Sequence, residues 1–325
     1  MAIEVIKPGL ATSVQDLGRP GYYNIGIPLS GALDQYALRL ANLLVGNDEG
    51  AAALEATLLA PELRFRAATI VAISGAEVTP KINGEARPRN QSFAVKEGDT
   101  LTFDFMKSGA RAYIAVAGGI DVPVVLGSRS TYGLGALGGF SGRKLAAGDV
   151  LPVGTPKPAA RAGRAVPSDL IPTYPKSLEL RVVTGLYFYR LTDESAKTFF
   201  EDIWTVAPEA DRIGYRYRKG RALAFRERQQ PFGAGSDPSN IVDAGYPYGS
   251  IQIPGGLEPI ILHRDAVSGG GYAMIGTVIS ADMDRIAQMQ PNNLAKFIEV
   301  DMATALKARA EYKNRQVRLK SQLSG

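Results

Sequence analysis

The stretch GSDPSNIVDAGYPYGSIQIPGGLEPIILHRDAVSGGGY, residues 235–272, joins a polar loop, a Gly-Tyr-Pro-Tyr-Gly segment, an apolar run at 259–262 and a glycine-rich end. Short apolar runs bounded by Gly, Pro, Asn and Asp are typical of β-strands connected by tight turns. The glycines at 269–271 predict a turn in which the backbone approaches a ligand closely and aims successive N–H groups at an anion. A polar hairpin loop that needs glycine for its backbone angles would account for the same residues.

The strand pattern continues outside this stretch. Runs of four to eight residues occur throughout, for example ELRFR (62–66), TIVAIS (69–74), TLTFDF (100–105), RAYIAVA (111–117) and ELRVVTG (179–185). The clearest helical pattern is LDQYALRLANLLVG (33–46), with Ser30 as its expected N-cap and Gly46 as its stop. The sequence therefore predicts a mainly β protein, built from barrels or sandwiches with a few short helices.

The chain of 325 residues is long enough for two domains with hydrophobic cores of their own. The segment 152–177 is rich in proline and poor in large apolar residues, which is typical of an extended linker. We therefore expect an N-terminal domain over 1–153, a linker over 154–177, a C-terminal domain over 178–300 and a basic tail over 301–325. The tail can form a helix, but its weak amphipathic pattern predicts fraying.

Composition excludes several classes of function. The chain has no cysteine and one histidine, so disulfides, zinc–thiolate sites and iron–sulfur clusters are ruled out, and no metal site is expected. It lacks a long apolar run and a signal-peptide pattern, so we expect no membrane span and a cytoplasmic location. The net charge of +5 comes from 154–176 and 307–325, while the remaining sequence is neutral to slightly acidic, which argues against a nucleic-acid partner.

Four further segments carry a family resemblance. They are TSVQDLGRPGYYNIGIPLSGALDQYALRLANLLVGNDEGAAALE (12–55), GSRSTY (127–132), GGFSGRKLAAGDVL (138–151) and DRIGY (211–215). With them, the chain from about Gly9 to Phe297 resembles the family of biotin-dependent carboxyltransferase subunits, which is also known as allophanate hydrolase subunit 2, as the C subunit of 5-oxoprolinase and as the Kip antagonist. Within this family, the loop 235–272 is most similar to the carboxyltransferase domain of urea carboxylase.

The resemblance implies two cyclophilin-like β-barrel domains in a subunit that moves a carboxyl group from carboxybiotin to an amide or urea nitrogen. The chain has no Met-Lys-Met biotinylation tripeptide and no apparent ATP-grasp region, so biotin is expected on another protein and ATP only through the partner system. The expected partners are a companion subunit of the Kip-inhibitor or allophanate hydrolase subunit 1 type, a biotin carboxylase, a biotin carrier protein and a small amide or urea-like substrate.

Two alternatives to this function remain open. One is the C subunit of an ATP-dependent 5-oxoprolinase, which opens a cyclic amide without biotin. The other is a non-catalytic Kip-type regulator that sequesters its companion subunit. In either of the two enzyme systems, we expect the chain to be active only with a partner subunit.

Carboxyl transfer requires that an anionic carboxylate is held and that developing negative charge is stabilised. Arg19, Arg129 and Arg143 lie in Gly- and Ser-rich loops and are the candidates for holding the carboxylate. Loop arginines also commonly bond backbone carbonyls, which is the alternative for each of them. Ser268, Tyr272 and the backbone around Gly270 are the candidates for stabilising an oxyanion.

The reaction also needs a base and groups that recognise the acceptor. Asp265 is the preferred base, and an Asx-turn is its alternative; Asp34 stands at a helix start, where its anion is favoured. Asn240 and Gln252 are candidates for reading an amide or urea, because a primary amide offers a complementary donor and acceptor. His263 ends an apolar strand and is expected to be structural. We expect the site residues of both halves to form one active surface.

Overall fold

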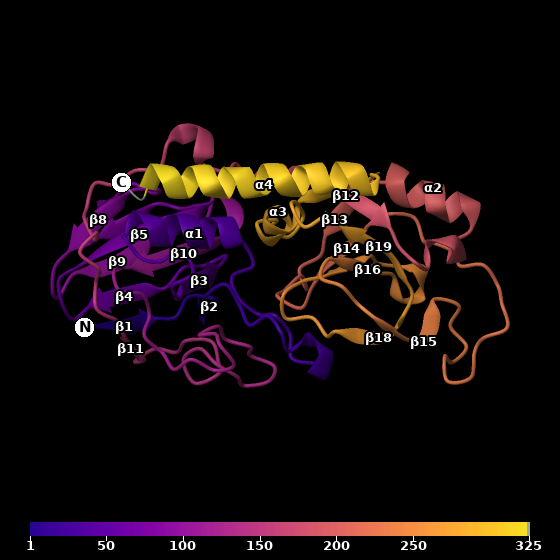
Figure 1. Ribbon diagram of the computed structural model, residues 1–325, viewed down its shortest axis with the longest axis horizontal. Coiled ribbons are helices and arrows are strands. Elements are labelled where there is room, and N and C mark those ends of the chain that lie inside the picture. Colours follow the sequence, from indigo (N-terminus) through magenta and orange to yellow (C-terminus); the bar gives the residue numbers. More distant parts are fainter. Residues whose placement is uncertain (324–325) are drawn as a thin grey trace. The chain divides into compact units, whose positions relative to one another are not determined.

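The computed structural model describes residues 1–323, which form two compact units. The first unit contains 1–19, 30–174 and the described residues from 313 on, and the second contains 20–29 and 175–312. Strands make up most of the regular structure in both units (Figure 1), which confirms the predicted mainly β architecture.

The first unit contains two antiparallel sheets that enclose one hydrophobic core. The strand orders are β11-β1-β4-β9-β6-β7 and β2-β3-β10-β5-β8. In the core, Val5 and Phe65 of the first sheet lie in one cluster with Ile73 and Ile114 of the second. The strands are β1 (Ala2–Lys7), β2 (Ala11–Gln15), β3 (Ala53–Thr57), β4 (Glu62–Phe65), β5 (Thr69–Glu77), β6 (Pro80–Ile82), β7 (Glu85–Ala86), β8 (Ser92–Val95), β9 (Thr100–Phe103), β10 (Ser108–Val116) and β11 (Val150–Pro152).

Helix α1 (Gln35–Leu44) packs on β5 and β10 of the first unit. Its amphipathic sequence buries Tyr36, Leu40 and Leu44, as the helical spacing predicts. Strand β10 is buried along almost its whole length because the core covers one of its faces and α1 packs against it as well.

The C-terminal end of α1 agrees with the prediction, whereas its N-terminal cap does not. The helix stops as expected at Gly46, whose φ of 79° is in the left-handed region. The expected N-cap at Ser30 is wrong, because Asp34 caps the helix by accepting a hydrogen bond from the backbone N–H of Ala37 at 2.9 Å. Ser30 has a φ of 50° and belongs to the turn before the helix.

The second unit contains a closed barrel of seven strands in the order β12-β19-β16-β17-β14-β13-β20. Aromatic side chains fill its core: the rings of Phe199 and Phe297 stack with centroids 4.6 Å apart, beside the buried Trp204. The barrel strands are β12 (Ser177–Thr184), β13 (Trp204–Val206), β14 (Gly214–Arg218), β16 (Ser250–Gln252), β17 (Ile260–Leu262), β19 (Met274–Val278) and β20 (Leu294–Glu299). The helices are α2 (Asp193–Glu201), which carries Phe199, and α3 (Met283–Ala287).

Two segments differ from the expected domain division. Residues 20–29 group with the second unit, where the Tyr23 hydroxyl donates to the Val267 carbonyl at 3.3 Å. Residues 154–174, expected to form an extended linker, pack on the first unit: Leu170 is buried and Arg164 donates to the Leu43 carbonyl at 2.8 Å. The proline-rich composition correctly indicated irregular backbone, but it carries no signal for these long-range contacts.

The basic tail forms helix α4 (Met302–Leu323) instead of a frayed segment, and the last two residues of the expected tail lie outside the described residues. Side chains near its C-terminal end hold it to the first unit. The Arg315 guanidinium lies over the Tyr36 ring at 4.6 Å, and Arg318 pairs with Asp169 at 2.6 Å. These contacts provide the tertiary support that its weak amphipathic pattern does not reveal.

A buried ion pair holds the start of α1 against the second sheet of the first unit. Glu55 on β3 and Arg111 on β10 are almost completely buried, with Nε and Oε1 3.6 Å apart. The other Glu55 oxygen accepts hydrogen bonds at 2.8 Å from the Tyr113 hydroxyl and the Leu33 N–H. Burial first, and then the charges of Glu55 and Asp34, hold the pKa of Tyr113 well above its ordinary value, so this hydroxyl stays a donor.

Removing the Glu55 charge is expected to destabilise the first unit strongly. Glu55→Gln takes away the carboxylate that neutralises the buried Arg111 and should lower the free energy of unfolding by about 3–5 kcal/mol. Urea denaturation measures the change. The control is Glu62→Gln in the exposed pair Lys7–Glu62, which should cost less than about 1 kcal/mol. Equal losses in the two variants would contradict the argument.

Candidate functional site

In the first unit, three loops meet at the buried carboxylate of Asp16, which directly follows β2. This carboxylate accepts hydrogen bonds from the Ser128 hydroxyl at 2.7 Å, the Ser130 hydroxyl and the Arg129 backbone N–H at 2.6 Å. The Asp16 carbonyl accepts from the Ala32 N–H at 2.8 Å. Asp16 therefore fixes the loop 16–19, the loop 30–33 and the loop 128–131 relative to one another within this unit.

Two of the predicted anion-holding arginines lie in this cluster. Arg19 is fully buried and donates to the Ser130 carbonyl. Arg129 donates through Nε to the Val122 carbonyl at 2.8 Å and pairs through Nη2 with Asp121 at 2.8 Å. Both side chains bind the protein's own oxygens, so these contacts correspond to the loop-supporting alternative.

The other two predicted residues of this unit have separate surroundings. Arg143 forms a two-point ion pair with Asp149, with both N–O distances 2.8 Å. Asp34 is buried; besides capping α1, it accepts from the Tyr174 hydroxyl at 3.2 Å. Because its carboxylate is occupied by these donors, Asp34 serves as a cap and is poorly placed to act as a base.

In the second unit, Asn240, Gly270 and Tyr272 lie on a two-stranded sheet of β15 (Asn240–Gly245) and β18 (Gly269–Tyr272), with Ser268 directly before β18. The predicted turn at 269–271 is wrong, since these glycines form β18 and pair with β15. A Cβ on Gly270 would lie 3.0 Å from the Tyr246 ring. The glycine at this position therefore lets β18 approach the protein's own chain.

Tyr246 connects the two strands and the barrel. Its hydroxyl donates to the Tyr272 carbonyl and accepts from the Tyr272 N–H, both at 2.8 Å. Burial raises the pKa of Tyr246, against the smaller opposing effects of the hydrogen bonds from the Tyr272 N–H and from Gln252. Gln252 is buried beside it in β16, so it supports Tyr246, whereas the Tyr272 side chain is 41% exposed.

Asn240 has an unused hydrogen-bonding group. Its amide nitrogen donates to the Ala234 carbonyl at 3.0 Å. Its Oδ1 is buried and has no hydrogen-bond partner in the described part of the chain. A buried acceptor of this kind is costly without a donor, so it suits the N–H group of an amide or urea.

Asp265, the predicted base, is held in an ion pair. Arg212 of the DRIGY motif donates to its two oxygens at 2.7 Å and 3.1 Å. Both carboxylate oxygens are occupied by this guanidinium, and the pair locks the turn before β18. The neighbouring His263 is buried, with its ring nitrogens bonded to the Met283 carbonyl and the Arg264 N–H, which agrees with a structural role.

The structure adds the roles of two residues. Asp16 organises three loops, and the signal for this is its place at the end of a strand before a glycine-rich turn. Asp243 is an exposed carboxylate on β15, and among the described residues its side chain has neither a hydrogen bond nor an ion pair. It belongs to the same SDPSN–D–GY pattern as Asn240, and that spacing could have identified it.

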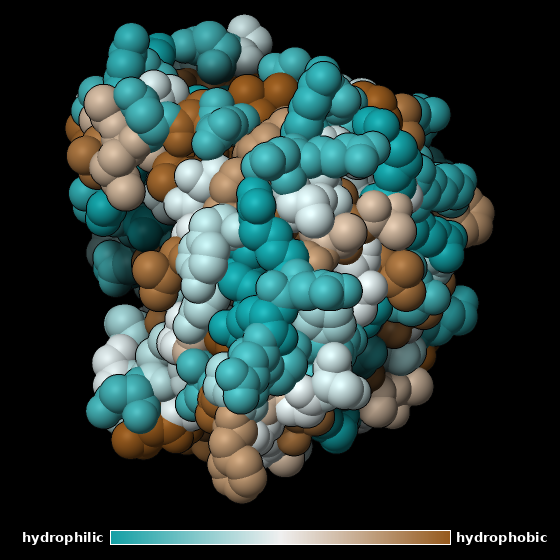
Figure 2. Space-filling model, turned by 90° about the vertical axis from the view of Figure 1, so that its right-hand side faces the viewer, coloured by the Kyte–Doolittle hydropathy of each residue, from teal (hydrophilic) through white to brown (hydrophobic). Residues whose placement is uncertain are grey.

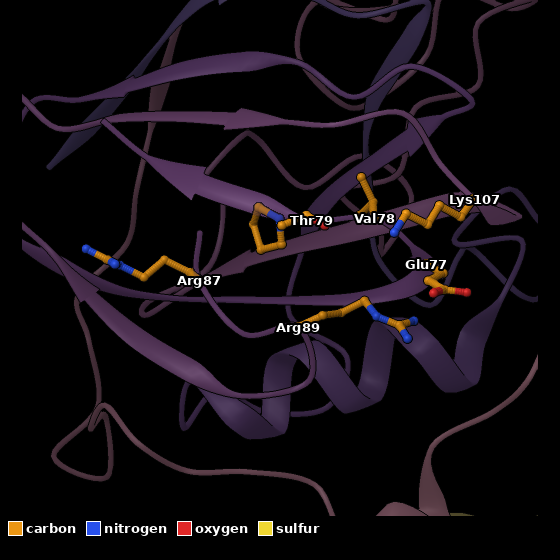
Figure 3. A pocket seen from close by; sticks show the side chains of 7 residues that line it. Glu77, Val78, Thr79, Arg87, Arg89 and Lys107 are labelled. Carbon is orange, nitrogen blue, oxygen red and sulfur yellow. The ribbon is translucent and has the colours of Figure 1, made fainter. Parts of the chain in front are cut away.

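A pocket of about 210 Å³ lies elsewhere on the first unit, lined by Glu77, Val78, Thr79, Pro80, Arg87, Arg89 and Lys107 (Figure 3). It contains none of the predicted site residues and is smaller than the clefts of about 300–1,000 Å³ that bind small molecules. Arg87 pairs with Glu85 at 3.0 Å and its guanidinium points away from the other labelled side chains. This pocket therefore adds nothing to the candidate site.

The surface, the acidic residues and the helices restrict the kinds of site that the chain can contain. The face in Figure 2 shows hydrophobic residues scattered among hydrophilic ones. Within residues 1–323, no group of three or more His, Cys, Asp or Glu side chains could hold a metal ion. None of the helices in the same range has the length and apolar composition that a membrane crossing requires. The expectation that both units form one active surface stays a prediction.

Fold and motifs together define a class of protein. The family model of the carboxyltransferase domain, subdomain A and B, matches residues 25–299, and the chain belongs to this family. The chain is 36% identical to urea amidolyase of Lachancea kluyveri over 94% of its own length but only 17% of that protein. It is 35% identical to the 5-oxoprolinase C subunit of Escherichia coli, over 95% of this chain and 94% of that protein.

A solved structure agrees with these relatives. The crystal structure of the urea carboxylase of Kluyveromyces lactis is similar with a TM-score of 0.90 and 36% identity, covering 98% of this chain and 29% of that one. The chain therefore has the carboxyltransferase fold that is also part of urea carboxylase and urea amidolyase, and it has close to the full length of a 5-oxoprolinase C subunit.

The ion pair of Arg143 predicts a pH-dependent contribution to stability. The Arg143 guanidinium is the main cause that lowers the pKa of Asp149. A carboxyl group with a lowered pKa in the folded state stabilises the fold above its unfolded pKa, and this stabilisation is lost as the pH falls through the folded pKa. Arg143→Gln should therefore lower the free energy of unfolding near pH 7 by less than about 1 kcal/mol, because the pair is half exposed. The thermal midpoint should fall accordingly.

The difference between wild type and Arg143→Gln should shrink in acid and vanish only when the pH is below the lowered pKa of Asp149 in the folded state. Differential scanning fluorimetry from neutral to acidic pH measures it. Lys144→Gln is the control, because this neighbouring exposed lysine has no ion pair in the described structure. A difference that is constant over the whole pH range would contradict the assignment.

Proposed function

We propose that the chain is the carboxyltransferase subunit of a biotin-dependent, urea-carboxylase-like system that carboxylates an amide or urea nitrogen. The observation that carries the proposal is the similarity of 98% of the chain to the urea carboxylase of Kluyveromyces lactis. The chain covers 29% of that protein. The proposal assigns carboxylation of biotin to a biotin carboxylase and its delivery to a biotin carrier protein.

The residues around β15 and β18 fit the chemistry of biotin. A ureido ring needs hydrogen-bond donors at its oxygen and apolar contact along its rings. Tyr272 offers an accessible phenol, and Val242 and Val267 are about half exposed in the same hairpin region. Tyr272, Ser268 and these valines would hold biotin, which would supply an activated carboxyl group.

The same sheet offers two functions toward the acceptor. The buried Oδ1 of Asn240 accepts an N–H bond and orients an amide or urea. The exposed carboxylate of Asp243, three residues along β15, accepts a proton from the acceptor nitrogen, because no guanidinium neutralises it in the described structure. Asp243 therefore replaces Asp265 as the proposed base, and Asp265 with Arg212 positions the turn before β18.

One observation favours a second function. The chain is 35% identical to the 5-oxoprolinase C subunit of Escherichia coli and covers 94% of that protein. In that system the substrate is a cyclic amide, the energy comes from ATP, and biotin is not needed. The Asn240 acceptor would serve a cyclic amide N–H equally well, so the two functions differ in cofactor and acceptor.

Reconstitution distinguishes these functions. The chain is expected to co-purify with a companion subunit of the Kip-inhibitor or allophanate hydrolase subunit 1 type, and activity should require both. The complex is assayed with carboxylated biotin carrier plus urea or simple amides, and in parallel with ATP plus 5-oxoproline. Carboxyl transfer supports the first proposal, whereas ATP-dependent ring opening without biotin supports the second. Full activity of the lone chain would contradict the need for a partner.

Two aspartate variants separate the proposed base from the positioning residue. Asp243→Asn should lower turnover by about 10²–10⁴-fold with an unchanged thermal midpoint, because it removes a proton acceptor from an exposed position. Asp265→Asn should mainly lower the thermal midpoint, because it breaks the ion pair with Arg212. Glu209→Gln, at another exposed carboxylate of this unit, is the control and should change neither. Normal turnover in Asp243→Asn would remove Asp243 from the mechanism.

A further inference from the structure

The second unit contains a buried arginine whose charge is not neutralised by any carboxylate of the described chain. Arg190 ends the short helix η3 (Phe188–Arg190) and is 2% exposed. Its Nη2 donates to the Pro238 carbonyl at 2.9 Å and approaches the Arg226 carbonyl at 3.5 Å. Its Nη1 is buried and has no hydrogen-bond partner within residues 1–323. A buried guanidinium in this condition is costly, so it indicates a missing anion.

A second arginine lies close to Arg190 and also has no carboxylate partner among the described residues. Arg228 donates to the Asn240 carbonyl at 3.1 Å and to the Gln230 side chain at 3.2 Å. Burial, and then the Arg228 charge, lower the pKa of Arg190, as two cations in proximity should do. The two guanidinium groups bind carbonyls only two residues apart, those of Pro238 and Asn240.

Two acidic groups near this segment are engaged elsewhere. Asp237 accepts from the Ser239 N–H at 2.8 Å and from the Ser239 hydroxyl at 2.7 Å. Asp193 pairs with Arg226 at 2.6 Å. Neither carboxylate neutralises Arg190 or Arg228 in the described structure.

The segment that these two arginines contact also contains an acceptor without a donor in the described part of the chain. Arg228 contacts the backbone of Asn240, and the Oδ1 of Asn240 is the buried oxygen that has no donor in the described part of the chain. The segment therefore contains a donor for an anion and an acceptor for an N–H group. A ligand that carries both a carboxylate and an amide-type N–H would satisfy the two groups together.

We propose that Arg190, Arg228 and Asn240 form a binding site for a small ligand that bears both a carboxylate and an amide N–H group. The identification of this ligand as the acceptor rests on the proposed function. The binding of the ligand does not depend on carboxyl transfer. Urea lacks the carboxylate, and phosphate lacks the N–H. The site therefore distinguishes acidic amides from both.

The segment 227–239 contributes to the site, because it contains Arg228 and the Pro238 carbonyl that contacts Arg190. It runs from β14 toward β15 (Figure 1), and Phe232 within it is fully exposed. A bound ligand should therefore order the segment and slow its proteolysis.

Binding is tested on the purified full-length chain without partners, so failure of carboxyl transfer does not affect the result. The probes are N-acetylglycine, acetate, acetamide and inorganic phosphate at one ionic strength. N-acetylglycine should raise the thermal midpoint saturably and slow trypsin cleavage within 227–239, and the other three should do so weakly or not at all. Isothermal titration calorimetry then gives the dissociation constant.

Arg228→Gln should weaken binding of N-acetylglycine by tenfold or more while leaving the fold intact, because Arg228 is partly exposed. Arg226→Gln is the matched control two residues away, and its binding should stay within twofold of the wild type. No saturable binding, equal binding of phosphate, or equal loss in the two variants would overturn the proposal.

Discussion

The first unit depends on carboxylates that have been removed from water and must find donors inside the fold. Glu55 on β3 and Asp16 at the end of β2 are both buried, and β2 and β3 are neighbours with Ser13 paired to Glu55. A buried carboxylate is stable only if hydrogen bonds and opposite charge replace its hydration. Glu55 therefore pairs with Arg111 and accepts hydrogen bonds from Tyr113 and from the start of α1. Asp16 accepts hydrogen bonds that hold the loops 16–19 and 128–131 together.

The second unit follows the same rule, with arginine as the usual partner. Asp282 is completely buried and binds Arg181 through two oxygens at 2.7 Å and 3.0 Å, and Asp265 binds Arg212. Each pair ties a loop to a barrel strand or to a neighbouring turn. Against this background, the charges that have no ion-pair partner in the described chain become informative: the carboxylate of Asp243 and the guanidinium groups of Arg190 and Arg228. Burying Arg190 without a carboxylate is costly, which supports a role in binding.

The sequence predicts much of the fold because its signals are local. Alternating apolar runs identified β5, β9, β10 and β12, and helical spacing identified α1. The turn at Asn292 fits the tolerance of asparagine for the left-handed region, and its φ is 69°. Glycine was less informative at 269–271, because the absence of a side chain serves a tight turn and a strand packed against the Tyr246 ring equally well.

The site is harder to predict because the role of a charged residue depends on its distant partner. Arg212 and Asp265 are 53 residues apart, so nothing local shows that the favoured base is already neutralised. Arg129 likewise takes its contacts from Asp121 and from Asp16, more than 100 residues away. The sequence pattern contains Asp243, but only the structure shows that no described cation pairs with it. The sequence therefore directs attention to this region, whereas the choice between its carboxylates needs the structure.

The two proposed functions can be compared through the charge of the acceptor. Urea is neutral and small, so a site for it needs hydrogen bonds but no cation. A cyclic amide such as 5-oxoproline carries a carboxylate beside its amide N–H. The carboxylate would be a partner for Nη1 of Arg190 and the N–H a partner for Oδ1 of Asn240, two atoms without a hydrogen-bond partner among the described residues. A buried arginine in a site for a neutral acceptor would cost free energy without a compensating interaction. The charge pattern of the second unit therefore favours an acidic amide as the acceptor, whether the reaction that follows is carboxyl transfer or ring opening.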